Sequence, residues 1–189
     1  MKSSTVCQEW LNSLPPTEGY LKKEQSIGRK FLSEQGMPSK VDEAWRLSNL
    51  NKLNSFLTLS TIIDSKDVQS DLELIFPEKE ENRKRIIINP NKNPILNINL
   101  PNGIEIMSRG EIEEEIGKVV SSTNIKNDIS VCLNQASSID LLALKVKRNF
   151  NQSLEFVIPS IQGKSISTRI LLIVEEGAKL DLLQIFLGN

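Results

Sequence analysis

The first third of the chain carries apolar residues at the spacing of an α-helix. Val6, Trp10 and Leu14 fall on one side of a first predicted helix. The pair Pro15-Pro16 ends it, because proline lacks the amide hydrogen that a helix interior needs. A second helix is predicted over residues 17–35. Its apolar side is marked by Leu21, Ile27 and Phe31.

Residues 1–54 are predicted to form a helical N-terminal domain. Two short helical turns, around 41–46 and 50–53, follow the second helix. The pattern weakens over residues 55–85, which contain a densely charged run typical of an exposed linker. Residues 86–189 therefore form the second predicted unit, an α/β segment.

After residue 85 the period of the apolar residues changes to that of a β-strand. Apolar runs at 95–100 and 104–107 flank the pair Asn102-Gly103, which favours the tight turn of a β-hairpin. Two helices are then predicted. The first begins at Ser108 and carries four acidic residues, Glu111, Glu113, Glu114 and Glu115. The second covers residues 128–136, with Ile129, Cys132 and Leu133 on one side.

Strands dominate the last third of the chain. Residues 142–147 alternate between apolar side chains and Ala or Lys, which predicts one buried and one wetter face. A short strand is expected at 154–158, and residues 170–174 are apolar on both faces, as in a strand covered on two sides. Helices followed by stacked strands predict an α+β or solenoid-type fold.

The last predicted pair of strands, residues 169–186, raises the question of what covers it. A terminal apolar strand is an open edge that attracts another strand. The strands are also too few to complete a layered β structure. We therefore expect a truncated β-solenoid whose isolated chain self-associates through this segment.

Composition and charge make several classes of function less favoured. The 189 residues have a formal net charge of −1, so no overall field favours nucleic acid or an anionic membrane. The basic pieces Arg83-Lys84-Arg85 and Lys145-Val146-Lys147-Arg148 are short. No apolar stretch approaches the ~20 residues that cross a bilayer, and the first residues do not resemble a signal peptide. A cytoplasmic protein is expected.

Few side chains suit catalysis. Histidine is absent, which removes the usual general base and the commonest metal ligand. Cys7 and Cys132 are too few for a zinc site and are interpreted as free thiols, with Cys132 a core residue. The glutamates at 111–115 are interpreted as a solvated helix start favoured by the helix dipole. No catalytic, cofactor-binding or metal-binding residue is predicted.

Trp45 and Arg46 form the most distinctive aromatic-basic pair. An indole beside a guanidinium can anchor a protein interface. The preferred interpretation is that Trp45 packs the short helices onto the β part.

Residues 28–53 resemble the N-terminal segment of the SufB/SufD family of iron-sulfur cluster assembly proteins, especially its SufD-like members. The likeness lies in order and spacing. The matching positions are Gly36, Pro38, Glu43, Trp45-Arg46, Leu50 and Leu53. The segment at 169–186 also resembles the entry into the β-helix of that family, with Arg169 leading one strand and a corner at Val174-Glu175-Glu176-Gly177-Ala178. Residues 100–120 and 133–146 extend the resemblance.

This resemblance implies a helical N-terminal domain followed by the start of a right-handed β-helix. It implies a non-enzymatic scaffold that works with a SufB-like paralogue and a SufC-like ATPase, with the iron-sulfur cluster held by the complex. The family's partner-binding and cluster-assembly positions lie beyond the matched stretch, so no residue here inherits them.

Two other functions stay open. An adaptor could bind a partner through residues 28–53 alone, or the chain could be an inactive remnant of a longer protein. A polysaccharide-acting β-solenoid enzyme ranks last, because no pair of acidic residues converges on a predicted strand.

Overall fold

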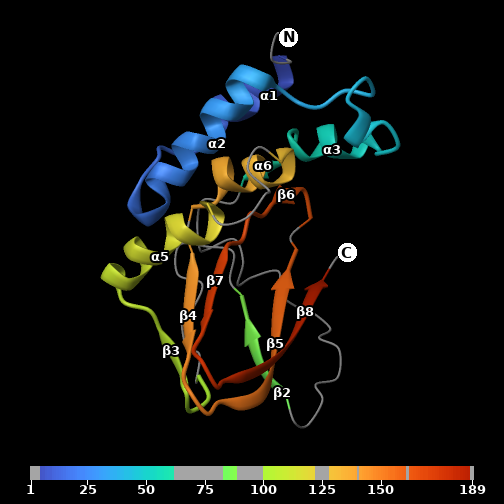
Figure 1. Cartoon of the computed structure of the whole chain (residues 1–189). Helices are drawn as coiled ribbons and strands as arrows, with labels where there is room; N and C mark the ends of the chain where they lie inside the picture. The colour runs from blue at the N-terminus through green and yellow to red at the C-terminus, as the bar shows by residue number, and fades with distance from the viewer. Residues whose placement is uncertain are drawn as a thin grey trace.

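The structure is a computed structural model, and it describes residues 5–61, 83–88, 100–121, 128–139, 141–160 and 162–187. Helices gather at one end of the molecule and strands at the other (Figure 1). The fold class is therefore α+β, as predicted. Residues 95–99 of the predicted run at 95–100, and the charged run before Arg83, lie outside the described residues.

The helical end is built from α1 (Thr5–Ser13), α2 (Lys22–Gln35), α3 (Leu50–Phe56) and α6 (Ile129–Ser137). Short 3₁₀ turns, η1 (Gly19–Leu21) and η2 (Glu43–Trp45), precede α2 and α3. These elements confirm both predicted long helices and both short helical turns. In the described part of the chain, no helix is long and apolar enough to cross a membrane.

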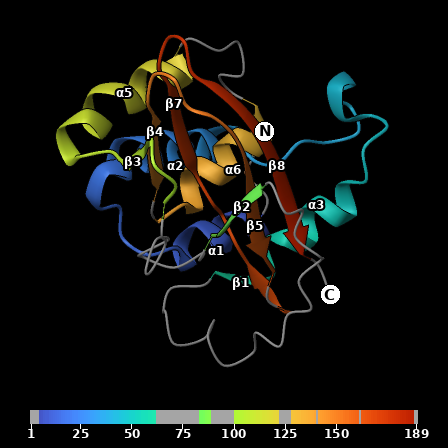
Figure 2. The same cartoon turned by 90° about the horizontal axis from the view of Figure 1, so that it is seen from below.

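The strands of the described residues form two three-stranded sheets and one short pair. One sheet has the order β2 (Arg83–Ile87), β5 (Asn151–Pro159), β8 (Lys179–Leu187), with parallel neighbours. The other has the order β3 (Ile104–Ile106), β4 (Leu142–Val146), β7 (Ile170–Val174). Strand β1 (Ser60–Thr61) pairs with β6 (Lys164–Ser165). Figure 2 shows the strands from below, with the helices behind them.

In both sheets, paired residues of neighbouring parallel strands are separated by the same number of positions in the sequence. Leu142 on β4 pairs with Ile170 on β7, and Asn151 on β5 pairs with Lys179 on β8. Both pairs are parallel, and partners are 28 residues apart in each sheet, as Ser153 and Asp181 are. The chain therefore passes through the two sheets twice, in the same order.

The main core lies between the two sheets. Alternate side chains of β2, β4 and β5 point into this core. Ile86, Leu144 and Phe156 are examples, and each is almost fully buried. The outer face of the β3-β4-β7 sheet is also covered, by α5 (Arg109–Ser121), through contacts among Ala143, Leu171 and Ile112. The prediction that β7 is covered on both faces is thus confirmed. The wetter face predicted for β4 is instead largely covered by α5.

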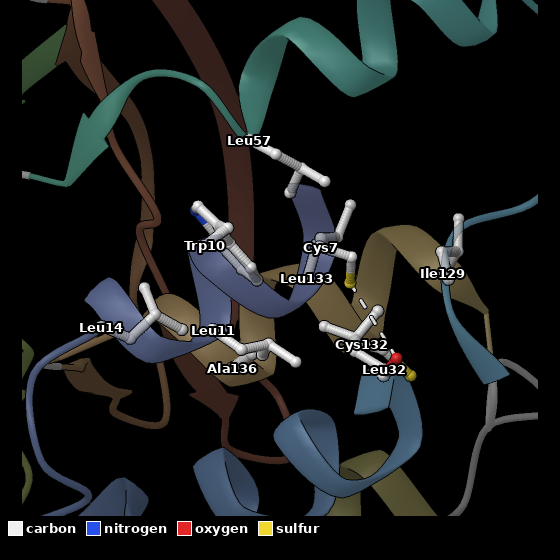
Figure 3. Packing of buried hydrophobic residues seen from close by; sticks show 10 residues of the cluster. All are labelled: Cys7, Trp10, Leu11, Leu14, Leu32, Leu57, Ile129, Cys132, Leu133 and Ala136. Carbon is white, nitrogen blue, oxygen red and sulfur yellow. Dashed lines mark hydrogen bonds between the residues drawn. The ribbon is translucent and has the colours of Figure 1, made fainter. Parts of the chain in front are cut away.

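A second core holds the helices together (Figure 3). Side chains from α1, α2 and α6 pack around Trp10 and Leu32, and Leu57 joins them. Trp45 packs against this helical cluster, which corrects the prediction that it contacts the β part. Since α6 comes from the predicted second domain, the helices of residues 1–54 do not pack by themselves; the predicted boundaries at 54 and 85 stay a prediction.

The buried side of α2 differs from the predicted one. Ile27 is 47% exposed, whereas Glu24, Gln25, Gly28 and Leu32 face inward. The polar members are buried because they bond to α6 and its end. Gln135 Nε2 donates to Glu24 Oε2 at 2.8 Å, and Gln25 Nε2 donates to the Ser138 carbonyl at 2.7 Å. On α1 the buried side likewise carries Cys7 and not Val6.

Other differences concern strand partners and bounds. Strand β3 pairs antiparallel with β4, and Gly103, with φ +91°, forms the turn before it. The predicted hairpin partner at 95–100 lies outside the described residues except for Leu100. Strand β5 is longer than residues 154–158, and β2 already begins at Arg83, within the stretch predicted as a linker.

Candidate partner-binding edge

Strands β7 and β8 are the outermost strands of their sheets on the same side of the repeat. In the described part of the chain, β7 pairs only with β4, and β8 pairs only with β5. Each strand therefore leaves one row of backbone donors and acceptors without a described partner strand. Such a row is the template on which a further strand can pair.

The backbone bonds show which residues face this edge. Lys179 N donates to the Phe150 carbonyl at 2.7 Å, and Ser160 N donates to the Leu187 carbonyl at 2.8 Å. Along a strand, the backbone N–H and C=O groups of successive residues point to opposite sides. The backbone groups of the odd-numbered residues of β8 therefore point toward β5. The N–H and C=O groups of Leu182, Gln184 and Phe186 point toward the open side.

Apolar side chains are exposed along the same strand. Phe186 is 71% exposed, and Leu182 and Leu183 are each more than one-third exposed. Leu182 and Phe186 share the parity of Leu154 and Ile158, which are buried core residues on β5. The two exposed side chains thus continue the core face of the sheet onto its last described strand. A further strand at this edge would bury them.

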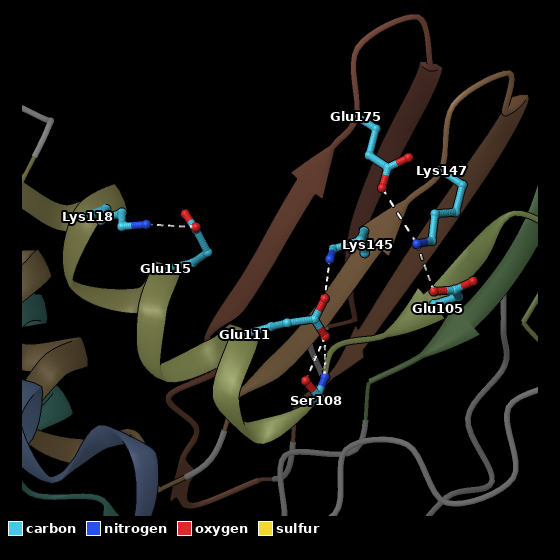
Figure 4. Close-up of polar contacts among 8 residues, drawn as sticks. All are labelled: Glu105, Ser108, Glu111, Glu115, Lys118, Lys145, Lys147 and Glu175. Atoms are coloured by element: carbon cyan, nitrogen blue, oxygen red, sulfur yellow. Dashed lines mark hydrogen bonds and ion pairs between the residues drawn. The ribbon is translucent and has the colours of Figure 1, made fainter.

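The turn between β7 and β8 is fixed by a small charged cluster (Figure 4). Glu175 accepts a hydrogen bond from Arg148 N at 2.9 Å, and this bond is the main cause of its lowered pKa. Lys147 Nζ lies 3.1 Å from Glu105 and 3.6 Å from Glu175. The cluster joins the ends of β3, β4 and β7. It therefore holds the start of β8 in place.

Glu111 performs a structural role of the same kind. Its carboxylate binds Lys145 of β4 and accepts bonds from the backbone N and Oγ of Ser108, both at 2.8 Å (Figure 4). These contacts, the one with Lys145 first, lower the pKa of Glu111 to about 2. The residue both caps α5 and attaches it to the sheet.

The other glutamates of α5 are used within the helix. Arg109 Nε donates to Glu113 at 2.8 Å, and Lys118 lies 3.1 Å from Glu114 and 3.0 Å from Glu115. These are exposed pairs between neighbouring helical turns, which contribute little to stability. These glutamates therefore fit the solvated helix start that the sequence predicts, whereas Glu111 does not, because it is bonded to the sheet.

The two basic pieces are also bonded within the fold. Arg83 lies 3.0 Å from Asp181, and Arg85 pairs with Glu155. Glu155 is almost completely buried in the middle of β5. Its pairing with Arg85 was not predicted from the sequence. The only hint was a carboxylate within an apolar run and an arginine within another. With Lys145 and Lys147 paired as above, both pieces hold strands together.

The two thiols are core residues, as predicted for Cys132. Both are buried and neither forms a disulfide, and the Cys7 thiol lies 3.9 Å from the Leu32 carbonyl (Figure 3). Burial, with the charge of Asp128, raises the pKa of Cys132 to about 11, so it stays protonated at neutral pH. Among the described residues, no three His, Cys, Asp or Glu side chains form a group that could hold a metal ion.

No family model matches the chain, and no curated protein matches its sequence. The open β7–β8 edge is therefore the feature from which a function can be argued.

Proposed function

We propose that the chain is a non-enzymatic, SufD-like scaffold component of a cytoplasmic iron-sulfur cluster assembly complex. The observation that carries the proposal is the repeat of two parallel strand pairs with the same 28-residue offset, ending in an open edge. Parallel strands stacked at a constant interval are the unit of a β-solenoid. The resemblance of residues 28–53 and 169–186 to the SufB/SufD family supports a scaffold role for the proposed solenoid.

In this proposal the chain binds partner proteins and carries out no chemical step itself. Its thiols are buried and histidine is absent, so we assign no cluster ligand to any of its residues. The cluster is the cargo of the complex. A SufB-like paralogue and a SufC-like ATPase are the proposed partners, and the β7–β8 edge is the surface from which the assembly extends.

The test is to tag the chain in its native cells, purify it without oxygen and identify the co-purifying proteins by mass spectrometry. Recovery of a SufB-like paralogue and a SufC-like ATPase is expected. The double variant Leu182→Lys/Phe186→Lys should lose them, because it places two charges on the edge. The control is Ile106→Lys, which charges another exposed strand residue at the far edge of the β3-β4-β7 sheet.

A second function, a protein-protein adaptor, is favoured by a different observation. Val41 and Leu47 are 92% and 94% exposed on either side of η2, in a segment that extends away from the body of the molecule (Figure 1). Two apolar side chains so exposed on one short segment are suited to a partner surface. If the adaptor function holds, Val41→Lys/Leu47→Lys abolishes partner recovery and the edge variant retains it.

That comparison needs the whole chain. Gly28 and Leu32 pack against α6, so residues 28–53 cut out alone would lose the surface that supports them. Recovery of the tagged chain without any partner, from cells that express both Suf proteins, would contradict the scaffold proposal.

A further inference from the structure

A cavity of about 330 Å³ lies between α5, α6 and the start of β7. Aliphatic side chains form most of its wall, and the polar contributions come from Asn134, Thr168 and Arg169. Its volume is at the lower end of the range for small-molecule pockets. It is separate from the exposed side chains of β8.

Arg169 is the unusual member of this wall. Its Nη1 atom is buried and has no hydrogen-bond partner among the residues that the structure describes, and burial lowers the pKa of the guanidinium. An arginine does not lose its charge in a protein, so the group remains a cation there. A buried N–H donor of a cation that lacks an acceptor is costly, and natural structures normally supply one.

Among the described residues, no acceptor is bonded to Nη1. Glu24 is the carboxylate whose charge acts on Arg169, but no hydrogen bond or ion pair joins the two, and Glu24 Oε2 accepts a bond from Gln135. The Thr168 carbonyl accepts a bond from Asn134 Nδ2 at 3.0 Å and none from Arg169 Nη1. The aliphatic walls formed by residues such as Ile116 and Leu141 offer no acceptor.

The position of Arg169 is fixed. Its carbonyl accepts a bond from Leu142 N at 3.0 Å, which ties it to β4 at the point where β7 begins. Leu171, two residues later, is buried against α5. The backbone of Arg169 is thus held at the wall of the cavity by the sheet, and the strand that follows it is held by the helix.

We propose that this cavity binds a small organic carboxylate, whose anionic group pairs with Arg169 and whose apolar body contacts the aliphatic wall. The guanidinium selects the charge, since a carboxylate can accept two parallel N–H bonds from it. The aliphatic side chains select an organic anion over a hydrated inorganic one. The chain would bind this ligand whether or not it joins a larger assembly.

The test uses benzoate as the probe and benzyl alcohol as its neutral counterpart of similar size. Each is titrated into the full chain while amide NMR spectra are recorded. We expect saturable benzoate shifts at Asn134, Arg169 and Leu171, and binding of benzyl alcohol at least about tenfold weaker, the effect of losing a charge-assisted hydrogen bond. Inorganic phosphate should bind more weakly than benzoate, because it has no apolar body.

Two variants localise the effect. Arg169→Gln should remove the preference for benzoate over benzyl alcohol. Val119→Trp provides a second test that leaves Arg169 in place. Val119 lines the cavity and is 42% exposed, so a bulky side chain there blocks the site without entering the core. Val6→Trp is the matched control, since Val6 on α1 is also 42% exposed but lies outside the cavity wall.

The expected result is that benzoate binding survives Val6→Trp and is lost in Val119→Trp. The proposal is overturned if benzoate produces no saturable shift, if benzyl alcohol binds equally well, or if Val119→Trp leaves binding unchanged in a chain whose spectrum is otherwise native.

Discussion

Gly28 on α2 lies against Gln135 on α6 with no room for a side chain between them. A Cβ placed on Gly28 would stand 2.7 Å from the Cβ of Gln135, and 2.8 Å from both Ala136 N and the Cys132 carbonyl oxygen. These atoms are mostly backbone, so they cannot turn aside. The contact fastens a helix from the first third of the chain to one that follows β3.

Gly28→Ala should therefore destabilise the protein, by about 1–3 kcal/mol, the usual cost of overpacking. The control is Gly110→Ala on α5, where an added Cβ meets nothing within 4 Å and the higher helix propensity of alanine should stabilise by up to about 1 kcal/mol. Urea unfolding of both variants measures the two effects. Equal stability of Gly28→Ala and the parent chain would mean that the two helices are not in contact in solution.

Glu111 should make stability depend on pH in the acid range. Its pKa in the folded chain is about 2, below the ordinary 4.5, so its contribution is fully present above about pH 4.5 and is lost as the pH falls through about 2. Glu111→Gln should lower the free energy of unfolding at neutral pH, and the difference from the parent should vanish near pH 2.

The measurement is urea unfolding at a series of pH values. Lys145→Met provides the complementary variant, because it removes the first cause of the lowered pKa. A difference between Glu111→Gln and the parent that stayed constant down to pH 2 would show that Glu111 does not make these contacts.

Neither thiol should react in the folded protein. Cys7 and Cys132 are buried, and the pKa of Cys132 is raised to about 11, so little thiolate forms at neutral pH. A thiol reagent should modify both only after urea is added. Ser130→Cys, on an exposed position of the same helix as Cys132, is the positive control. Rapid labelling of the native parent chain would argue against the helical core described above.

The isolated chain should self-associate through β8. Its open backbone groups and the exposed Leu182 and Phe186 favour pairing with another copy when no other partner is present. Light scattering should show a mass that rises with concentration. Leu182→Lys/Phe186→Lys should shift the chain toward the monomer, whereas Ile106→Lys should not. A parent chain that stays monomeric throughout would refute this prediction.

Periodicity predicted most of the individual elements but not how they pair. Alternation marks a strand such as β4, yet it does not say that Leu142 lies beside Ile170, because parallel partners are distant in sequence and many registers bury the same face. The common offset of the two sheets could be recognised only once both pairs were seen. The open edge was nevertheless predicted, because two apolar runs at 169–186 lacked enough strands to cover them.

The buried polar residues escaped prediction for a related reason. Glu24, Gln25 and Glu155 are buried because partners distant in sequence form hydrogen bonds or ion pairs with their side chains. A prediction from the pattern of apolar residues assigns such polar side chains to the surface. The same holds for Arg169, whose position at a cavity depends on α5 and α6 as well as on β7.

Hydrogen exchange on β8 tests the central claim most directly. It should be measured on the dilute, monomeric chain and on the assembly recovered from native cells. The account predicts that the outward amides of Leu182, Gln184 and Phe186 exchange quickly in the isolated chain and slowly in the assembly, while amides of β5 stay protected in both. If the amides of β8 exchange at the same rate in both samples, the β7–β8 edge is not where partners bind.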